Sequence, residues 1–256
     1  MRSVLLLTFI LAGTALGQGG PPLSIDDTGT PGAGVVELIT ALQLELDGDS
    51  RAWAAPVIDL AVGLGDQAQV TVTVPLLGRQ EDAPGPTHIG VGRANVGFKY
   101  RFLEEEDHGF SASVGPNFDF EVDGSAARRG LDDDRWSFNL PVQLQFPLYD
   151  EFGLGLEAAW SISEDGANGV SGGIALSWAL TEDFELVGDI VGESSGVPDL
   201  HFGVFELEDS GVFFDVGFRW AAAEDFNVLF SLGRDLFRSR AEHVDLRFYL
   251  GFQFVF

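Results

Sequence analysis

Residues 246–256, LRFYLGFQFVF, alternate between two kinds of side chain. Every even-numbered position in this stretch holds Leu or Phe, whereas the odd-numbered positions hold Arg247, Tyr249, Gly251, Gln253 and Val255. A period of two places successive side chains on opposite faces of a β-strand. The stretch therefore predicts a C-terminal strand with one strongly apolar face and one face of mixed, mostly small or polar residues.

The same parity recurs along the chain, most clearly in residues 136–148, 152–162 and 212–220. In 136–148 the even positions are all large and apolar, while Asn139, Gln143 and Gln145 are odd. An apolar face rich in Phe, Trp and Leu opposite a face of small and polar residues is typical of a barrel whose outside contacts lipid. We predict an all-β fold, a closed antiparallel transmembrane β-barrel of the bacterial outer membrane. Its twelve strands are expected at 35–46, 53–64, 67–77, 89–103, 108–121, 135–148, 152–163, 169–181, 184–193, 211–221, 225–234 and 243–256.

The connections between these strands are of two kinds. Those after even-numbered strands are short and acidic, at 65–66, 104–107, 150–151, 182–183 and 224–225. Several of those after odd-numbered strands are longer, at 78–88, 122–134 and 194–210. Short periplasmic turns and longer external loops are the rule in Gram-negative outer-membrane barrels. The acidic turns are therefore predicted to face the periplasm, and the C-terminal Phe256 to be read by the barrel assembly machinery.

The N-terminus has the features of an export signal. Arg2 precedes an apolar stretch from Val4 to Leu16, and Ala15 and Gly17 are the small residues expected before a cleavage site. We predict a signal peptide over 1–17, a flexible Gly- and Pro-rich segment over 18–34, and the barrel over 35–256. The segment 18–34 could extend into the periplasm as a flexible tail or fold into the lumen, and the sequence leaves both placements open.

Composition excludes several classes of protein. The 40 Asp and Glu residues against 14 Lys and Arg give a formal charge of −26, which argues against a nucleic-acid footprint because phosphates need a basic face. With no cysteine the chain can form neither disulfides nor thiolate metal sites. No cofactor and no metal site are predicted.

Basic residues are placed unevenly. Arginines concentrate in or beside the predicted external loops, whereas none lies in a periplasmic turn. Guanidinium groups bind phosphate in bidentate fashion, and the outer leaflet of such a membrane carries anionic phosphates. We expect lipopolysaccharide to bind near Arg51, Arg79, Arg128, Arg129, Arg238 and Arg240.

Four stretches then suggest a family: 27–32 (DTGTPG), 56–66 (PVIDLAVGLGD), 70–76 (VTVTVPL) and 97–102 (GFKYRF). Their order resembles the phenol-degradation (MetA-pathway) family of outer-membrane proteins over about residues 26–256. The resemblance implies a porin-like barrel associated with uptake of small solutes, aromatic compounds among them. It supplies no binding or catalytic residues to carry over.

Enzyme chemistry finds no support. A serine hydrolase of the outer membrane needs a Ser activated by a neighbouring His, and no His-x-Ser arrangement occurs around His88, His108, His201 or His243. The acidic run 132–134 lacks the Gly and distal Glu of a calcium loop. We predict that the protein is not an enzyme.

The odd face carries charges that would line a lumen. These candidates are Asp59, Lys99, Arg101, Glu157, Asp189, Asp215, Arg219 and Arg247. They could form a narrow polar path in which charge rings set selectivity, or a salt-bridged filling that makes the wall rigid. The first alternative predicts a passive channel for small solutes that prefers cations. The second predicts a closed structural or adhesive barrel whose external loops bind partners.

Overall fold

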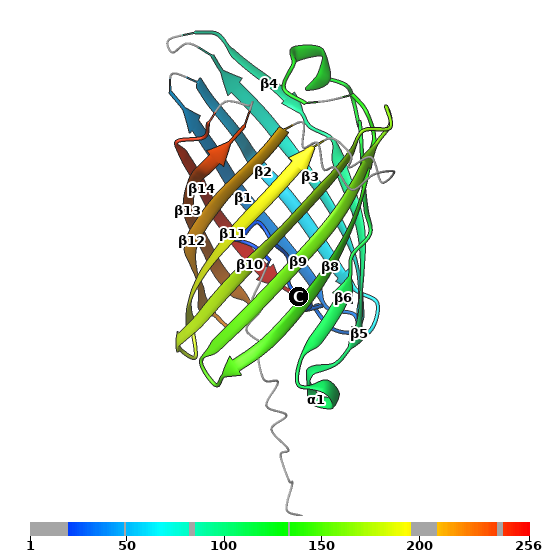
Figure 1. Ribbon diagram of the computed structural model, residues 1–256, viewed down its shortest axis with the longest axis vertical. Helices are drawn as coiled ribbons and strands as arrows, with labels where there is room; N and C mark the ends of the chain where they lie inside the picture. The colour runs from blue at the N-terminus through cyan, green and yellow to red at the C-terminus, as the bar shows by residue number, and fades with distance from the viewer. Residues whose placement is uncertain (1–19, 49, 82–84, 133, 196–208, 240–242) are drawn as a thin grey trace, which may run out of the picture.

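The computed structural model describes residues 20–48, 50–81, 85–132, 134–195, 209–239 and 243–256. Within them the strands form one closed antiparallel barrel, because β14 pairs with β13 on one side and with β1 on the other (Figure 1). The strands are β1 (Val36–Asp47), β2 (Ser50–Gly63), β3 (Ala68–Gln80), β4 (Thr87–Val91), β5 (Ala94–Leu103), β6 (Ser111–Val114), β7 (Asn117–Phe120), β8 (Ser137–Tyr149), β9 (Phe152–Ser163), β10 (Asn168–Thr181), β11 (Phe184–Ser195), β12 (Asp209–Ala223), β13 (Phe226–Arg238) and β14 (Leu246–Val255). Two single-turn helices, α1 (Glu105–His108) and η1 (Ala127–Arg129), lie in connections.

The fourteen strand segments occupy twelve positions in the wall. Both β4 and β5 pair with β3, and both β6 and β7 lie between β5 and β8. The predicted twelve-stranded antiparallel barrel is therefore confirmed.

Continuous strands over 89–103 and 108–121 were expected, and this detail is wrong. The first is broken at Gly92 and Arg93, where the Arg93 N–H donates to Asp132 Oδ2 (2.8 Å) instead of to a neighbouring strand. The second is broken at Gly115 and Pro116, since proline has no N–H for the ladder.

The second of these strands also begins later than predicted. Residues 105–108 form α1, which ends at Gly109 in the left-handed conformation, with a φ of 75°. Glycine adopts this conformation without the steric cost that other residues incur. The strand β6 consequently starts at Ser111 instead of at residue 108.

Side-chain alternation decides what faces outward. With three exceptions, the large apolar residues exposed on the described surface have even numbers, and the buried charged residues of the strands have odd numbers. The exceptions Ile89, Tyr149 and Phe237 each lie beyond a strand break or a register shift. An added residue at such a point moves every following side chain to the other face.

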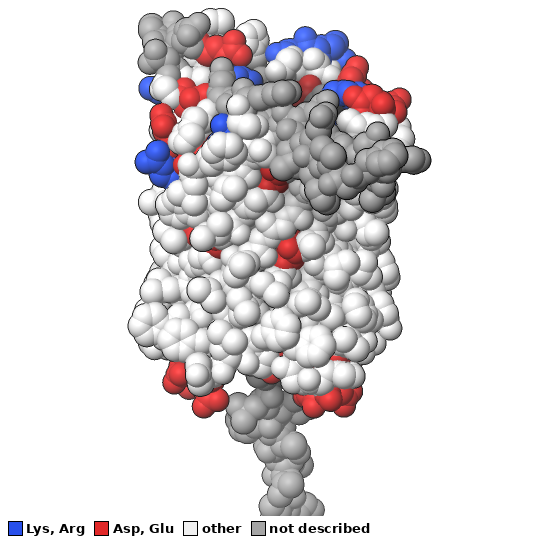
Figure 2. All heavy atoms as spheres, in the orientation of Figure 1, with Lys and Arg blue, Asp and Glu red and all other residues white. Residues whose placement is uncertain are grey.

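The outer surface has a band with few charged residues between two charged rims (Figure 2), and many large apolar side chains of the strands are exposed on it. We call the rim with the short acidic turns the turn end, and the rim with the β1–β2 hairpin and η1 the loop end. Acidic residues gather at the turn end, whereas Lys or Arg and acidic residues both occur at the loop end (Figure 2). The band has the composition of a lipid-facing wall.

Some predicted features lie outside the described residues: the signal peptide 1–17, Arg240, and residues 196–208 of the predicted connection 194–210. In the part that is described, no helix has the length and hydropathy needed to span a bilayer.

The facing of β8 can be tested by a pair of substitutions. Val142 points outward at 41% exposure near the middle of the strand, so Val142→Arg should lower the free energy of unfolding by roughly 2–4 kcal/mol. Asn139 is half-buried on the opposite face, so Asn139→Arg should cost much less. The measurement is the urea midpoint of each variant refolded into lipid vesicles. Equal losses in both variants would contradict the assigned facing.

Candidate functional site

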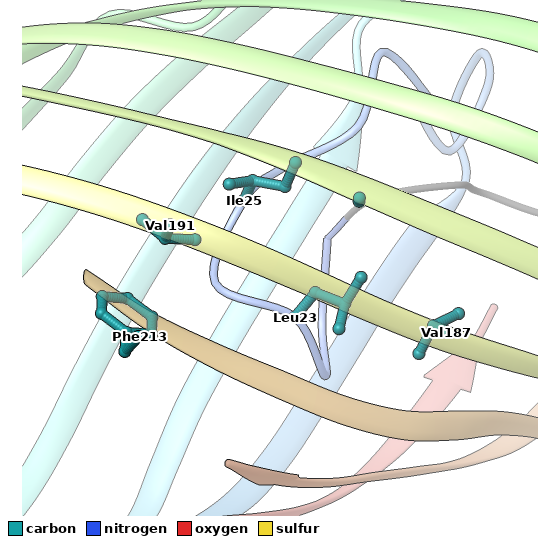
Figure 3. Packing of buried hydrophobic residues seen from close by; sticks show 6 residues of the cluster. Leu23, Ile25, Val187, Val191 and Phe213 are labelled. Atoms are coloured by element: carbon teal, nitrogen blue, oxygen red, sulfur yellow. The ribbon is translucent and has the colours of Figure 1, made fainter. Parts of the chain in front are cut away.

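Residues 20–34 lie inside the barrel and occupy the half of the lumen near the turn end (Figures 1 and 3). The segment leads into β1 beside the turn end, where the Gly34 N–H donates to the Gly63 carbonyl (2.9 Å). Farther in, Leu23 and Ile25 pack against Ala175, Val187, Val191 and Phe213 of the wall (Figure 3). The sequence leaves open whether this segment extends into the periplasm or folds into the lumen, and in the structure residues 20–34 fold into the lumen. The flexibility and domain boundaries predicted for 18–34 stay predictions.

Two carboxylates from neighbouring strands hold the inner end of this segment. Asp189 on β11 and Asp215 on β12 are direct cross-strand partners. Asp189 Oδ2 accepts hydrogen bonds from the backbone N–H groups of Ser24 (2.9 Å) and Ile25 (3.3 Å), and the Ser24 hydroxyl donates to Asp215 Oδ2 (3.1 Å). Hydrogen bonds to charged groups are among the stronger ones in proteins, each worth about 1.5–3 kcal/mol.

A second contact runs through β9, β8 and β6. Glu157 Oε2 accepts from the Asp26 N–H (3.1 Å) and from the Gln143 side-chain amide (3.1 Å). The other end of that amide accepts from the Ser113 hydroxyl (2.8 Å). This chain of bonds fixes the direction of the Glu157 carboxylate toward the segment.

Lys99 on β5 carries the positive charge that balances the acids of the segment. Its Nζ lies 2.7 Å from Asp26 Oδ2 and 3.8 Å from Asp27 Oδ1, and it donates to the Asp27 carbonyl (2.8 Å). Burial raises the pKa of the Asp27 carboxyl, and Lys99 opposes this shift.

Thr28 anchors the next turn of the segment. Its hydroxyl donates to Gln145 Oε1 (2.6 Å) and lies 2.6 Å from the Ser111 hydroxyl, and the side chain is buried. The Arg101 guanidinium donates to the Thr28 carbonyl (3.5 Å) and to the Asp66 carbonyl in the first acidic turn (2.7 Å). The segment is thereby tied to both the wall and the rim.

Arg219 on β12 binds the other end of the segment. Its guanidinium donates to the carbonyls of Gly20 (2.8 Å) and Pro21 (2.9 Å) and to the buried carboxylate of Glu185 (3.0 Å). The Ser231 hydroxyl donates to the Pro22 carbonyl (2.9 Å). Carbonyls that have no strand partner inside the lumen are satisfied in this way.

The remaining two candidates have other partners. Arg247 lies 3.1 Å from Asp235 and 3.4 Å from Glu45, with its guanidinium 4.0 Å above the Phe213 ring. Asp59 on β2 is half-buried and accepts a hydrogen bond from Thr73, its neighbour on β3. In the described part of the chain, no hydrogen bond joins either residue to the segment.

A cavity of about 540 Å³ lies between the segment and the loop end. Its floor is formed by residues 21–24, and its walls include Gln43, Arg79, Arg247 and Tyr249. Leu131, from the connection that contains η1, also lines it. Cavities of this size hold small organic molecules.

The sequence therefore identified residues that the structure brings together, but not what they contact. Six of the eight candidates bind the segment: Lys99, Arg101, Glu157, Asp189, Asp215 and Arg219. The candidate set omitted Gln143, Gln145, Ser111, Glu185 and Ser231, which complete the contacts. All five occupy odd positions. Extending the parity argument from charged to neutral polar residues would have found Ser111, Gln143, Gln145 and Ser231. The charged Glu185 satisfies the original parity argument.

Across the residues that the structure describes, no three His, Cys, Asp or Glu side chains are grouped so that they could hold a metal ion.

No family model matches the chain, and no curated protein is similar to it in sequence. Solved structures do resemble it. An outer membrane channel from Pseudomonas putida F1 has a TM-score of 0.70 at 15% identity, covering 91% of this chain and 100% of that one. The NanC porin has a TM-score of 0.56 at 8% identity, over 86% and 98% of the two chains, and the CymD monoaromatic hydrocarbon channel one of 0.53 at 8%, over 88% and 89%. At these identities the likeness shows the fold: a twelve-stranded barrel of the outer-membrane type.

The docked position of the segment can be tested with a disulfide. The Ser24 hydroxyl and the Asp215 carboxylate are in contact (3.1 Å), and the chain has no native cysteine. Ser24→Cys combined with Asp215→Cys should therefore cross-link under mild oxidation. The readout is a reductant-sensitive shift of the denatured protein on a gel, with each single variant as control. A double variant that stays fully reduced would place Ser24 away from β12.

Proposed function

We propose that this protein is an outer-membrane channel for small solutes in which residues 20–30 form the constriction. The observation that carries the proposal is the docking of this segment on the polar inner wall, through Lys99, Glu157, Asp189, Asp215 and Arg219. The contacts are hydrogen bonds and ion pairs to a short stretch of chain. A constriction of this kind can set the size and charge of what passes.

Three further features support passage of a solute. The interior is lined by charged, amide and hydroxyl groups, while the outer band is apolar (Figure 2). The cavity beside the loop end gives a solute of moderate size a place to enter. The proteins with this fold described above include an outer membrane channel, a porin and a monoaromatic hydrocarbon channel. Small solutes, aromatic compounds among them, are the substrate class that we propose.

Export and assembly complete the proposal. The predicted signal peptide would be removed near Gly17, and the turn end would face the periplasm. We expect the barrel assembly machinery to recognise the C-terminal strand β14, which is followed by Phe256. These steps are inferred from the sequence pattern.

Removing the constriction is the direct test. Deletion of residues 20–30 should raise single-channel conductance severalfold, because the acids and arginines that hold the segment would then line open water. Planar-bilayer recordings of the refolded mature protein provide the measurement. The oxidised Ser24→Cys/Asp215→Cys protein is the matched control, and its conductance should stay close to that of the parent.

The rival function is a closed structural or adhesive barrel. If neither the parent nor the deletion variant conducts, although both give the heat-modifiable gel mobility of a folded barrel, the channel proposal is wrong. Binding of partners by the loop end would then be the function to pursue.

Charge selectivity is a separate expectation. The inward-facing acids Glu37, Asp59, Glu157, Glu185, Asp189 and Asp215 outnumber the inward-facing cations Lys99, Arg101, Arg219 and Arg247, so the path should prefer cations. Asp59→Asn should lower this preference while conductance changes little, because Asp59 bonds to Thr73 and not to the segment. Asp189→Asn with Asp215→Asn should lower the preference and also loosen the segment. Reversal potentials in a salt gradient measure both effects. Unchanged values in all variants would show that these acids do not face the path.

A further inference from the structure

Arg234 on β13 faces away from the lumen. Its two chain neighbours point inward: a Cβ on Gly233 would meet the Asp215 side chain, and Asp235 is buried against Arg238 and Arg247. Alternation then directs Arg234 outward, where it is exposed and opposite Phe214 of β12.

The surroundings of Arg234 are apolar. Leu232 is exposed on its turn-end side, and Leu236 (55% exposed) and Phe237 (53%) lie on its loop-end side. The Arg234 Nε donates a long hydrogen bond (3.5 Å) to the Asp235 carbonyl. A cation that faces lipid costs roughly 2–4 kcal/mol at mid-depth and little at the interface, so this position needs a nearby anion or water.

Arg51 on β2 faces the same way. Ala54 is buried in an inward cluster, so alternation directs Trp53 and Arg51 outward. The Trp53 ring covers the backbone of Gly78, which leaves no room for a Cβ there. Arg51 is exposed and pairs in register with Leu46 of β1 and Gln80 of β3. Trp beside Arg is typical of the boundary between lipid tails and headgroups.

The two arginines belong to one face of the barrel. From Arg51 the register passes to Leu46 and then to Leu246 of β14, the strand next to β13. Three strand spacings separate β2 from β13, which is roughly 14 Å across the sheet. A single large anionic lipid headgroup can span this distance.

The other described arginines at the loop end are arranged differently. Arg93 pairs with Asp132, and Arg135 pairs with Asp165. Arg79 lines the cavity and pairs with Glu81, and Arg238 pairs with Asp235 and Glu193. Arg128 and Arg129 are on η1 and donate to the carbonyls of Asp123 and Ser125 in their own connection.

We propose that Arg51 and Arg234 bind the phosphates of lipid A on the face formed by β13, β14, β1 and β2. Guanidinium pairs with phosphate in bidentate fashion, and the leucines between the two arginines offer an apolar surface for acyl chains. The proposal rests on the outer-membrane location proposed above and is independent of solute passage.

The test measures lipid binding by the refolded mature protein. Arg51→Gln with Arg234→Gln is compared with Arg128→Gln with Arg129→Gln, which removes the same charge from η1. Native mass spectrometry titrates diphosphorylated lipid A, dephosphorylated lipid A and phosphatidylglycerol against each protein. We expect the first variant to bind diphosphorylated lipid A at least tenfold more weakly than the parent, and the second to bind like the parent.

Arg51→Lys with Arg234→Lys should recover part of the affinity, since a point charge remains but the bidentate geometry is lost. Heat-modifiable gel mobility and parent-like conductance show that each variant is folded, so failure here is distinguishable from failure of the channel proposal. The proposal is overturned if the Arg51 and Arg234 variants bind lipid A as the parent does, if the η1 variant loses affinity equally, or if the parent binds phosphatidylglycerol or dephosphorylated lipid A equally well.

Discussion

Closure of an alternating sheet is the constraint on which this structure depends. Once β14 pairs with β1, every outward position meets the surroundings and every inward position shares one narrow interior. Charged side chains such as Asp189, Asp215 and Glu185 are then enclosed, and an enclosed charge without a partner is costly. The interior must supply partners for these groups, and the wall alone supplies only some of them.

The N-terminal segment supplies many of the rest. Backbone N–H groups of Ser24, Ile25 and Asp26 meet carboxylates, while carbonyls of Gly20 and Pro21 meet Arg219. A segment with few bulky side chains can direct its N–H groups to carboxylates and its carbonyls to arginine within a narrow space. The charges that stabilise the segment are also those that a solute would meet, so the binding of the segment and the selectivity of the path are coupled through the same groups.

Irregularities in the wall have a local logic. The interruptions between β4 and β5 and between β6 and β7 lie beside prolines: Pro75, Pro116 and Pro141. At the first interruption, Asp132 accepts the hydrogen bond of the Arg93 N–H. Near the loop end of β13, a register shift turns Arg238 inward to its carboxylate partners, whereas Arg234, before the shift, faces outward. The extra residue at this shift therefore decides that Arg238 pairs with carboxylates inside the barrel while Arg234 faces the outside.

The sequence by itself predicted most strands, their facing and their antiparallel closure into a barrel. A period of two is a local property that can be read in each strand separately, as in residues 246–256. It also singled out odd-numbered charged residues as candidates for the interior, since parity separates Asp189, Asp215 and Arg219 from their chain neighbours. The break at Gly92 was missed because it depends on a partner far along the chain, Asp132, whereas the break at Gly115 is marked in the sequence by Pro116 and was overlooked. Only the tertiary structure decided where residues 20–34 lie: no periodicity marks the segment, and its place is set by groups on β5, β9, β11 and β12 that converge only when the barrel is closed.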